Sequence, residues 1–585
     1  MTLRDGAAPA PAVRRRAVDV ALLLLLALVV VATWIPRLHG PLDLRWDAGV
    51  YYVLGTSLAE GRGYRLLNEP GAIAAVQYPP LLPAFIAAHQ LISGTTDPVR
   101  VGRALRWSFL VLSLAFGWAT YALLRTRMTP AWAFVGSVIC AVHQFTAFLS
   151  DVCFAELPFV VVTCAFFVVS AAGSGRWREG LLGLLAAAAY GLRTAGVALF
   201  VAWIAESAVR GDIRRTAARL MMAAVPVLGW HAYVASVERS PAYAAPAYPY
   251  QRADYLFYNV SYARNMTLRD PDRPELGKVS YADLVARVLG YLPGVPAKLG
   301  ETASAPRDAL TQQIVELRTL LGLRVPLRLA DAGLLMLAGL ILGGLAIELV
   351  QRRPLLPFYV ATYTLLLCVV PWHDQPRYWF PLAPLSVLAL GRGALALADT
   401  LRGGRRVRLR WSRQAVGVGV ALLLLVQVIC LFAFYRDRHQ LVAYHDREGR
   451  LVRYRLFYYR EAYQALDAAL DWLRDRAAPT DIVAASMPHW AYLRTGLRAV
   501  MPPLERDWRV AARLLDAVPV AYLIVDARTQ SFTRQYGLPV MQQAPERWTL
   551  VHSLPEGGAH VFRRAAGSTG AGEGREAGAA RRPRP

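Results

Sequence analysis

The sequence predicts a mainly α-helical, polytopic transmembrane bundle followed by a carboxy-terminal extracytoplasmic α/β domain. Of its 585 residues, 55% are hydrophobic and 18% are charged, whereas soluble domains carry about 25% charged residues. Apolar runs of membrane-spanning length recur along the chain, and arginine-rich loops separate them. The net charge of +24 is spread over these loops and not gathered on one soluble surface. We therefore expect no nucleic-acid partner.

A helix needs about 20 apolar residues to cross about 30 Å of hydrocarbon. The segments that meet this requirement are 18–35, 105–124, 131–149, 154–172, 181–205, 217–237, 327–350, 355–371, 378–398 and 416–435. Residues 81–92 are too few to span, and they predict an interfacial or re-entrant helix. The first run has no small-residue cleavage site and ends in Trp34, Ile35 and Pro36. It is therefore interpreted as a retained span and not as a signal peptide.

Positive charge marks the cytoplasmic side of a membrane protein. The basic segments are the amino terminus, 125–127, 176–178, 210–219, 352–353 and 402–413. All of them fall on one side if residues 181–205 form a helical hairpin that returns to the side it entered from. The glycines at 191 and 196 suit the bend, which places the tip at residues 190–194. The outer face then holds 36–80, 150–153, 238–326, 371–376 and everything after Tyr435.

These assignments predict three regions. Residues 1–435 form a transmembrane module with outer loops 36–80 and 238–326, residues 436–564 form an extracytoplasmic α/β domain, and residues 565–585 form a disordered tail of Gly, Ala, Arg and Pro. Inside the second region, helical periodicity at 463–476 and 509–515 alternates with short apolar strands at 481–485 and 521–526. The five cysteines lie in or beside apolar runs and predict no disulfide framework. The scattered histidines show no zinc-binding spacing.

Ionisable side chains gather at the predicted outer edge of the bilayer. They are Asp47, Asp151, Glu156, Arg193, His373, Asp374 and Arg377. Ionisable groups held at a membrane boundary indicate function by default. Carboxylates and cations at one depth suit a reaction in which a nucleophile loses a proton while an anionic group departs. We therefore expect these residues to face one cavity.

The motifs around these residues resemble one family. They are Asp47-Ala-Gly-Val-Tyr51, Ala59-Glu-Gly-Arg-Gly-Tyr64, Gln77-Tyr78-Pro-Pro-Leu81, Ser150-Asp-Val-Cys-Phe-Ala-Glu156, Gly191-Leu-Arg-Thr-Ala-Gly196 and Arg377-Tyr-Trp-Phe-Pro381. In this order they resemble the GT-C glycosyltransferases, in the branch of protein mannosyltransferases and aminoarabinose transferases. The resemblance implies an inverting enzyme of the bacterial cytoplasmic membrane. Such an enzyme transfers a sugar from a polyprenyl-phosphate-linked donor to a cell-envelope acceptor at the outer face.

The resemblance also implies roles for the acids. Asp47 matches the first acid of the family's Asp-Glu pair and would be the general base or a group that orients the acceptor. Ala48 stands where the family has the second acid, so this loop lacks the usual two carboxylates. Asp151 or Glu156 is then expected to supply the second acid. A divalent metal is left open, and no other cofactor is assigned.

The basic and aromatic positions of the motifs imply a substrate pocket. Arg193 and Arg377 match positions that hold the lipid phosphate, and a guanidinium binds phosphate in a bidentate manner. The other residues expected to contact the substrate are Tyr51, Tyr78, His373 and Tyr378.

Structural alternatives compete with these roles. Asp47 could cap a helix at 48–59 and Asp151 a helix starting at Val152, because Asp is a favoured N-cap residue. Glu156 in an apolar helix favours a function or a salt bridge, and Arg377 could snorkel to the interface. The alternative function is a transporter or flippase of a lipid-linked substrate. Its polar residues should mark a path through the midplane instead of one side.

Overall fold

The computed structural model describes residues 12–173, 175–322, 324–371, 375–400, 408–445 and 450–565. The chain divides into two compact units. Unit 1 comprises Met1–Leu44, Tyr78–Ala235 and Ser280–Tyr458, and unit 2 comprises Arg45–Gln77, Ser236–Val279 and Tyr459–Pro585. The predicted disordered tail, 565–585, lies outside the described residues apart from its first residue.

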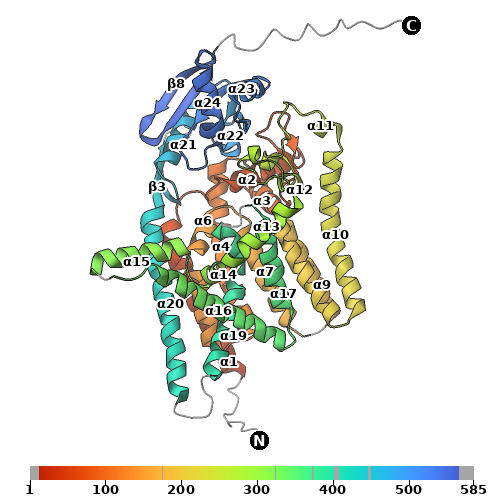
Figure 1. Ribbon diagram of the computed structural model, residues 1–585, viewed down its shortest axis with the longest axis vertical. Helices are drawn as coiled ribbons and strands as arrows, with labels where there is room; N and C mark the ends of the chain where they lie inside the picture. The colour runs from red at the N-terminus through yellow and green to blue at the C-terminus, as the bar shows by residue number, and fades with distance from the viewer. Residues whose placement is uncertain are drawn as a thin grey trace. The chain divides into compact units, whose positions relative to one another are not determined.

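Unit 1 is helical, with one β-hairpin that follows directly from α20 (Figure 1). Its helices are α1 (Ala12–Trp34), α3 (Leu81–Ser93), α4 (Pro98–Arg125), α5 (Pro130–Ala141), α6 (Gln144–Asp151), α7 (Glu156–Ala171), α8 (Arg176–Leu192), α9 (Val197–Val209), α10 (Ile213–Glu238), α13 (Tyr281–Tyr291), α14 (Val295–Ala303), α15 (Arg307–Leu321), α16 (Arg328–Val350), α17 (Leu355–Val369), α18 (Pro376–Trp379), α19 (Ala383–Thr400) and α20 (Arg408–Arg438). The hairpin is antiparallel and consists of β3 (His439–His445) and β4 (Leu451–Phe457).

Within the described residues, six helices are long and apolar enough to cross a membrane. They are Arg16–Arg37, Pro98–Arg125, Ile213–Glu238, Arg328–Val350, Pro376–Ala398 and Val416–Arg438. The predicted polytopic helical bundle is confirmed. The predicted spans 154–172 and 355–371 are the shorter helices α7 and α17, of 16 and 15 residues, whereas a straight span takes about 20.

The predicted span 131–149 is not one helix. α5 and α6 are bent by 59° at a break between them. His143 lies at this break, and its Nδ1 accepts a hydrogen bond of 3.1 Å from the amide of Phe145, which caps α6. The two helices together are apolar enough for one span, so the segment is a broken span or a re-entrant loop. Hydropathy averaged over the segment does not register the capping side chain at the break.

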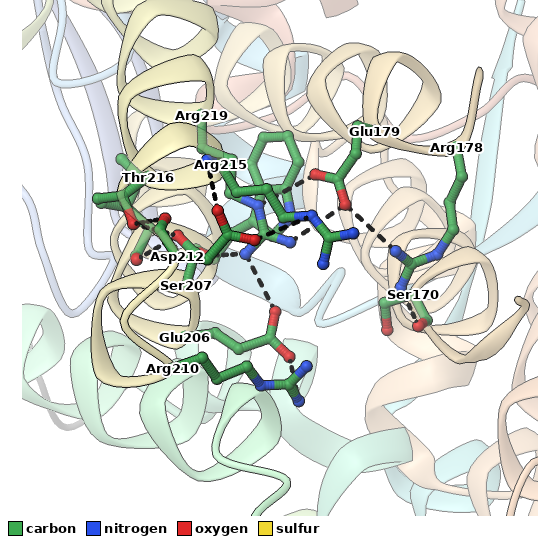
Figure 2. A network of polar contacts seen from close by, with 12 residues as sticks. Ser170, Arg178, Glu179, Glu206, Ser207, Arg210, Asp212, Arg215, Thr216 and Arg219 are labelled. Atoms are coloured by element: carbon green, nitrogen blue, oxygen red, sulfur yellow. Dashed lines mark hydrogen bonds and ion pairs between the residues drawn. The ribbon is translucent and has the colours of Figure 1, made fainter. Parts of the chain in front are cut away.

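Residues 181–205 form the predicted helical hairpin. α8 and α9 are separated by Arg193, which is extended with φ −148° and ψ 134°. At the other end, Arg219 of α10 pairs with Glu179 of α8 at 3.0 Å and with Glu206 of α9 at 3.1 Å (Figure 2). Because both ends of the hairpin contact the same arginine, the chain enters and leaves on one side of the bundle.

Other predicted cytoplasmic segments also contact one another. Asp19 of α1 pairs with Arg125 at the end of α4 at 2.9 Å, and Arg127 pairs with Glu348 near the end of α16 at 3.6 Å. The amino-terminal helix, the 125–127 loop and the end of α16 therefore lie together, as the charge pattern predicts. Of the basic segment 402–413, residues 402–407 lie outside the described residues.

A buried arginine fixes the turn that follows α1. Arg106 of α4 is 2% exposed. It donates hydrogen bonds to the carbonyls of Gly40 at 3.0 Å, Arg37 at 2.6 Å and Pro41 at 2.6 Å. Its charge is balanced by Asp151 at 2.6 Å. One side chain thus satisfies several backbone carbonyls that a turn at the membrane edge would otherwise leave without donors.

Unit 2 is an α/β unit built from three segments of the chain. Its five-stranded sheet has the order β6-β5-β7-β9-β8. The strands are β5 (Ile482–Ala484), β6 (Arg498–Val500), β7 (Val520–Val525), β8 (Trp548–Leu554) and β9 (Ala559–Arg564), and the helices are α21 (Glu461–Arg474), α22 (Pro488–Thr495), α23 (Trp508–Asp516) and α24 (Leu538–Gln543). The two helices and two strands predicted in this part of the chain are confirmed.

The sheet has helices on both faces. Alternate strand residues point to opposite faces, so Val483 packs with α21 and α22, whereas Ile482 packs with α23 and α24. The other two segments carry α2 (Asp47–Ala59), β1 (Arg65–Leu66), β2 (Ile73–Ala74), α11 (Pro241–Ala244) and α12 (Tyr262–Asn265). Buried Glu69 joins these segments by accepting hydrogen bonds from Tyr248 at 2.7 Å and Gln251 at 3.1 Å. Burial raises the pKa of Glu69.

Replacement of Asp151 by alanine should strongly destabilise the protein. Both side chains of the Arg106–Asp151 pair are 2% exposed, and removal of one partner leaves an uncompensated buried charge, which costs about 3–5 kcal/mol. Thermal unfolding of purified protein in detergent measures the effect. The control is Glu60→Ala, which breaks the exposed Arg62–Glu60 pair and should leave the midpoint unchanged. Equal midpoints for the two variants would contradict the structural role of the buried pair.

Candidate functional site

A buried carboxylate and a partly buried guanidinium meet at the tip of the helical hairpin. Glu156 is the first residue of α7 and is 2% exposed. Arg193 occupies the extended break after α8, and its Nη1 forms an ion pair with the carboxylate of Glu156. A carboxylate is favoured at a helix N-terminus because it faces the positive end of the helix dipole. The helix geometry and the ion pair therefore both fix the position of Glu156.

A second guanidinium joins this pair through a shared tyrosine. The guanidinium carbon of Arg193 lies 5.4 Å from the ring centroid of Tyr378, and that of Arg377 lies 4.8 Å from the same centroid. Arg377 donates a hydrogen bond of 2.9 Å to the Tyr378 hydroxyl and also stacks over Phe154. Tyr363 of α17 donates to the Tyr378 carbonyl at 3.0 Å. Arg193 was predicted from one motif and Arg377 and Tyr378 from another, and these residues form one cluster with Glu156.

The cluster lies one helix length from the basic loops of unit 1. α8 has 17 residues, which is about 26 Å at 1.5 Å per residue. Its first turn carries Arg178, which donates to the carbonyl of Ser170 in the last turn of α7 (Figure 2). Glu156 and Arg193 are therefore at the opposite ends of α7 and α8 from this contact. That separation is close to the thickness of the hydrocarbon core.

Asp151 has a different environment from Glu156. It is the last residue of α6, and the next helix does not begin until Glu156. The alternative that Asp151 caps a helix starting at Val152 is therefore wrong. Its carboxylate is engaged by Arg106 instead, so this acid holds the turn after α1.

Asp47 belongs to unit 2, where a strained residue precedes it. The N-cap of α2 is Trp46, with φ 56° and ψ −136°, and Asp47 is the first helical residue. The alternative that Asp47 is the N-cap of this helix is therefore wrong. A positive φ in a residue other than glycine costs about 1–3 kcal/mol and persists only where its surroundings impose it. The indole of Trp46 is fixed by a hydrogen bond of 2.8 Å to Tyr463.

Two residues that the sequence did not indicate accompany Asp47. Tyr258 donates a hydrogen bond of 2.9 Å to the Asp47 carboxylate. The Tyr258 ring stacks edge to face on buried His489, with centroids 4.8 Å apart. Burial lowers the pKa of His489 to about 3, although Asp47 acts in the opposite direction. Tyr258 could have been found only as part of a tyrosine-rich stretch, and nothing in the sequence marks His489.

The remaining residues that the sequence predicts to contact the substrate are Tyr51, Tyr78 and His373. Tyr51 is buried in α2 of unit 2, and Tyr78 is buried in unit 1. His373 and its neighbour Asp374 lie outside the described residues. In the part of the chain that the structure describes, no three His, Cys, Asp or Glu side chains gather as metal ligands. Ala48 is the neighbour of Asp47, and Asp151 pairs with Arg106, so these two acids do not fit a two-carboxylate metal site.

Replacement of His489 by phenylalanine should weaken the loss of stability at acidic pH. The folded pKa of about 3 is below the ordinary value of 6.5, so between these values only the unfolded state binds the proton. Above pH 6.5 the histidine is neutral in both states, and its burial does not make stability depend on pH. Below pH 6.5, protonation of the unfolded state lowers the free energy of unfolding by roughly 1.4 kcal/mol for each pH unit. Thermal midpoints at pH 7.5 and 5.5 test this expectation. An identical acid-induced decrease in both proteins would contradict it.

Comparison with known proteins identifies the fold. No family model matches the chain, and no curated protein matches its sequence. The oligosaccharyltransferase of Archaeoglobus fulgidus in complex with Zn and sulfate superposes with a TM-score of 0.51 at 13% identity, over 93% of this chain and 73% of that one. ArnT from Cupriavidus metallidurans bound to undecaprenyl phosphate superposes with a TM-score of 0.50 at 13% identity, over 95% of this chain and 99% of that one.

A further structure contains a different carrier lipid. AglB from Archaeoglobus fulgidus, in complex with an inhibitory peptide and a dolichol-phosphate, gives a TM-score of 0.50 at 13% identity, over 94% of this chain and 74% of that one. These neighbours are GT-C glycosyltransferases. The chain therefore has the GT-C fold that its motifs predict.

Proposed function

We propose that this protein is an inverting glycosyltransferase of the bacterial cytoplasmic membrane. It transfers a sugar from a polyprenyl-phosphate-linked donor to a cell-envelope acceptor at the outer face. The observation that carries the proposal is the cluster of Glu156, Arg193, Arg377 and Tyr378. It places two guanidinium groups about one membrane thickness from the basic loops of the same unit.

The chemistry follows from the charges. A hydroxyl of the acceptor attacks the anomeric carbon, the bond from that carbon to the phosphate oxygen breaks, and the electron pair leaves with the phosphate. Arg193 and Arg377 stabilise the charge that develops on the phosphate, as pre-placed guanidinium groups do at a boundary with little water. The carboxylate of Asp47 accepts the proton of the attacking hydroxyl. Attack opposite the departing phosphate inverts the anomeric centre.

The two other acids have different parts in this proposal. Glu156 is the second acid, because it contacts a phosphate-binding arginine and fixes its orientation. Asp151 is a positioning residue, because its buried carboxylate accepts a hydrogen bond from Arg106 through Oδ1. Tyr51, Tyr78 and Tyr378 line the sugar and lipid path, and His373 is assigned to the same path from the sequence alone.

The sidedness comes from the charge pattern. The arginine-rich loops are assigned to the cytoplasm by the positive-inside rule. The cluster lies at the other end of α7 and α8, and so is assigned to the outer face. The donor's polyprenyl tail remains in the bilayer while its phosphate reaches Arg193 and Arg377. The carboxy-terminal α/β region is proposed to be extracytoplasmic, with the boundary after Tyr435.

The double variant Glu156→Gln with Arg193→Gln should fold but bind undecaprenyl phosphate poorly. Joint removal of both charges leaves neither one buried and unpaired, whereas the phosphate loses charged hydrogen bonds worth about 1.5–3 kcal/mol, or roughly 10- to 100-fold in affinity. Native mass spectrometry of the purified protein with undecaprenyl phosphate measures this loss. The matched control removes the Asp19–Arg125 pair by Asp19→Asn and Arg125→Gln. Equal affinities of both double variants would exclude Arg193 from phosphate binding.

Replacement of Asp47 by asparagine should abolish transfer while expression and thermal stability stay at wild-type levels. Mass spectrometry of envelope glycans from a strain that lacks the protein, complemented with wild type or variant, reports the transferred sugar. Tyr258→Phe should reduce transfer about tenfold, because it removes one hydrogen bond to a charged group. Full restoration of the missing sugar by Asp47→Asn would exclude Asp47 as the base. A deletion strain with unchanged glycans would contradict the proposed function.

A further inference from the structure

A basic cavity at the edge of the bundle has no part in the proposed reaction. It has a volume of about 360 Å³ and is lined by Leu38, His39, Gly40, Arg103, Arg106, Trp107, Val452 and Arg453. All of these residues belong to unit 1. They come from the turn after α1, the start of α4 and the strand β4.

The cavity lies at a membrane boundary. The candidate span that contains α1 ends at Arg37, the span of α4 begins at Pro98, and the span of α20 ends at Arg438, immediately before the β-hairpin. The ends of α1 and α20 are joined by a hydrogen bond of 2.6 Å from the Tyr435 hydroxyl to the carbonyl of Thr33. Arg106 joins the turn after α1 to α4. Three spans therefore end around one cavity.

The cavity is lined by cationic side chains that are accessible at the protein surface. Arg103 and Arg453 are exposed, and within the described chain neither forms an ion pair with a carboxylate. The fixed guanidinium of Arg106 forms the floor, with its donors taken by backbone carbonyls and Asp151. Exposed His39 lies beside it. The site therefore offers two exposed guanidinium groups beside a third that is already paired, and the two exposed groups suit a phosphate group.

The surroundings of the cavity suit a lipid. Trp107 is 58% exposed, and tryptophan is the side chain most typical of a membrane interface. In the three candidate spans that end around the cavity, Ile35 directly after α1, Val111 of α4 and Phe432 of α20 are 61%, 64% and 71% exposed. These residues form apolar surfaces of candidate membrane helices. A molecule with a phosphate head and acyl chains would satisfy the cations and cover the apolar surfaces together.

We propose that this cavity binds the phosphate head of an anionic glycerophospholipid of the surrounding bilayer. Arg103 and Arg453 contact the phosphate from two sides, and Trp107 packs against the glycerol backbone. The acyl chains extend along α1 and α4. The site is separate from Glu156, Arg193 and Arg377, and the proposal does not rest on the proposed glycosyl transfer.

Native mass spectrometry of the full-length protein in detergent tests this site. The probes are dioleoylphosphatidylglycerol, dioleoylphosphatidylcholine with the same chains, and inorganic phosphate. Wild type should bind the anionic lipid more tightly than the zwitterionic one. Arg103→Gln combined with Arg453→Gln should weaken binding of the anionic lipid about 10- to 30-fold, because each cation near an anionic lipid contributes about a factor of five. Both residues are exposed, so the thermal midpoint should not change.

The matched control is Arg214→Gln. Arg214 is an exposed arginine at the start of the candidate span in α10, away from the cavity, and its loss should leave lipid binding within about twofold of wild type. Wild-type affinity in the double cavity variant would overturn the proposal. An equal loss in the Arg214 control would also overturn it, since binding would then depend on total charge. Displacement of the lipid by equimolar inorganic phosphate would overturn the lipid assignment.

Discussion

Pairing of opposite charges in apolar surroundings determines the arrangement of the helices in unit 1. A charged side chain inside a membrane bundle is stable only when a partner and further hydrogen bonds compensate its desolvation. The pair of Glu156 and Arg193 satisfies this condition only if α7 begins where the hairpin between α8 and α9 turns. The pair of Arg106 and Asp151 likewise fixes the end of α6 against α4. The charge pairing that folding requires therefore also positions Arg193, the candidate phosphate-binding arginine. No separate structural element is needed to hold it.

The candidate residues lie where regular backbone ends. Glu156 begins α7, Arg193 interrupts the hairpin, and Arg377 lies in the four-residue helix α18. In unit 2, Asp47 follows Trp46, whose φ of 56° is rare outside glycine. Irregular backbone at membrane depth persists only where the protein satisfies its polar groups, and the Tyr363 bond to the Tyr378 carbonyl is one example. Such positions expose side chains and backbone that a continuous helix would cover, which is why binding groups can be placed there.

The sequence was sufficient for the features that depend on local pattern. Hydropathy predicted the helical bundle, and the positions of the arginines predicted that both ends of residues 181–205 meet, as the contacts of Arg219 confirm. The motifs identified Glu156, Arg193, Arg377 and Tyr378, although not their contacts. Partners distant in sequence were missed: Arg106 for Asp151, and Tyr258 with His489 for Asp47. Periodicity reports which face of a helix is buried but not which side chain compensates a buried charge, because tertiary packing makes that choice.

Under the proposed function, the charges of Glu156, Arg193 and Arg377 affect the release of the polyprenyl phosphate carrier. Glu156 contributes one negative charge and the two arginines contribute two positive charges, so these three groups have a formal sum of +1. A polyprenyl-phosphate sugar is a phosphodiester with one negative charge, whereas the departing phosphate monoester approaches two. Interactions accelerate a reaction only when they are stronger in the transition state than in the bound states that flank it. A site with two uncompensated arginines would attract the dianionic product more strongly than one in which Glu156 offsets half of that charge. The carboxylate that orients Arg193 therefore also limits how tightly the spent carrier is held.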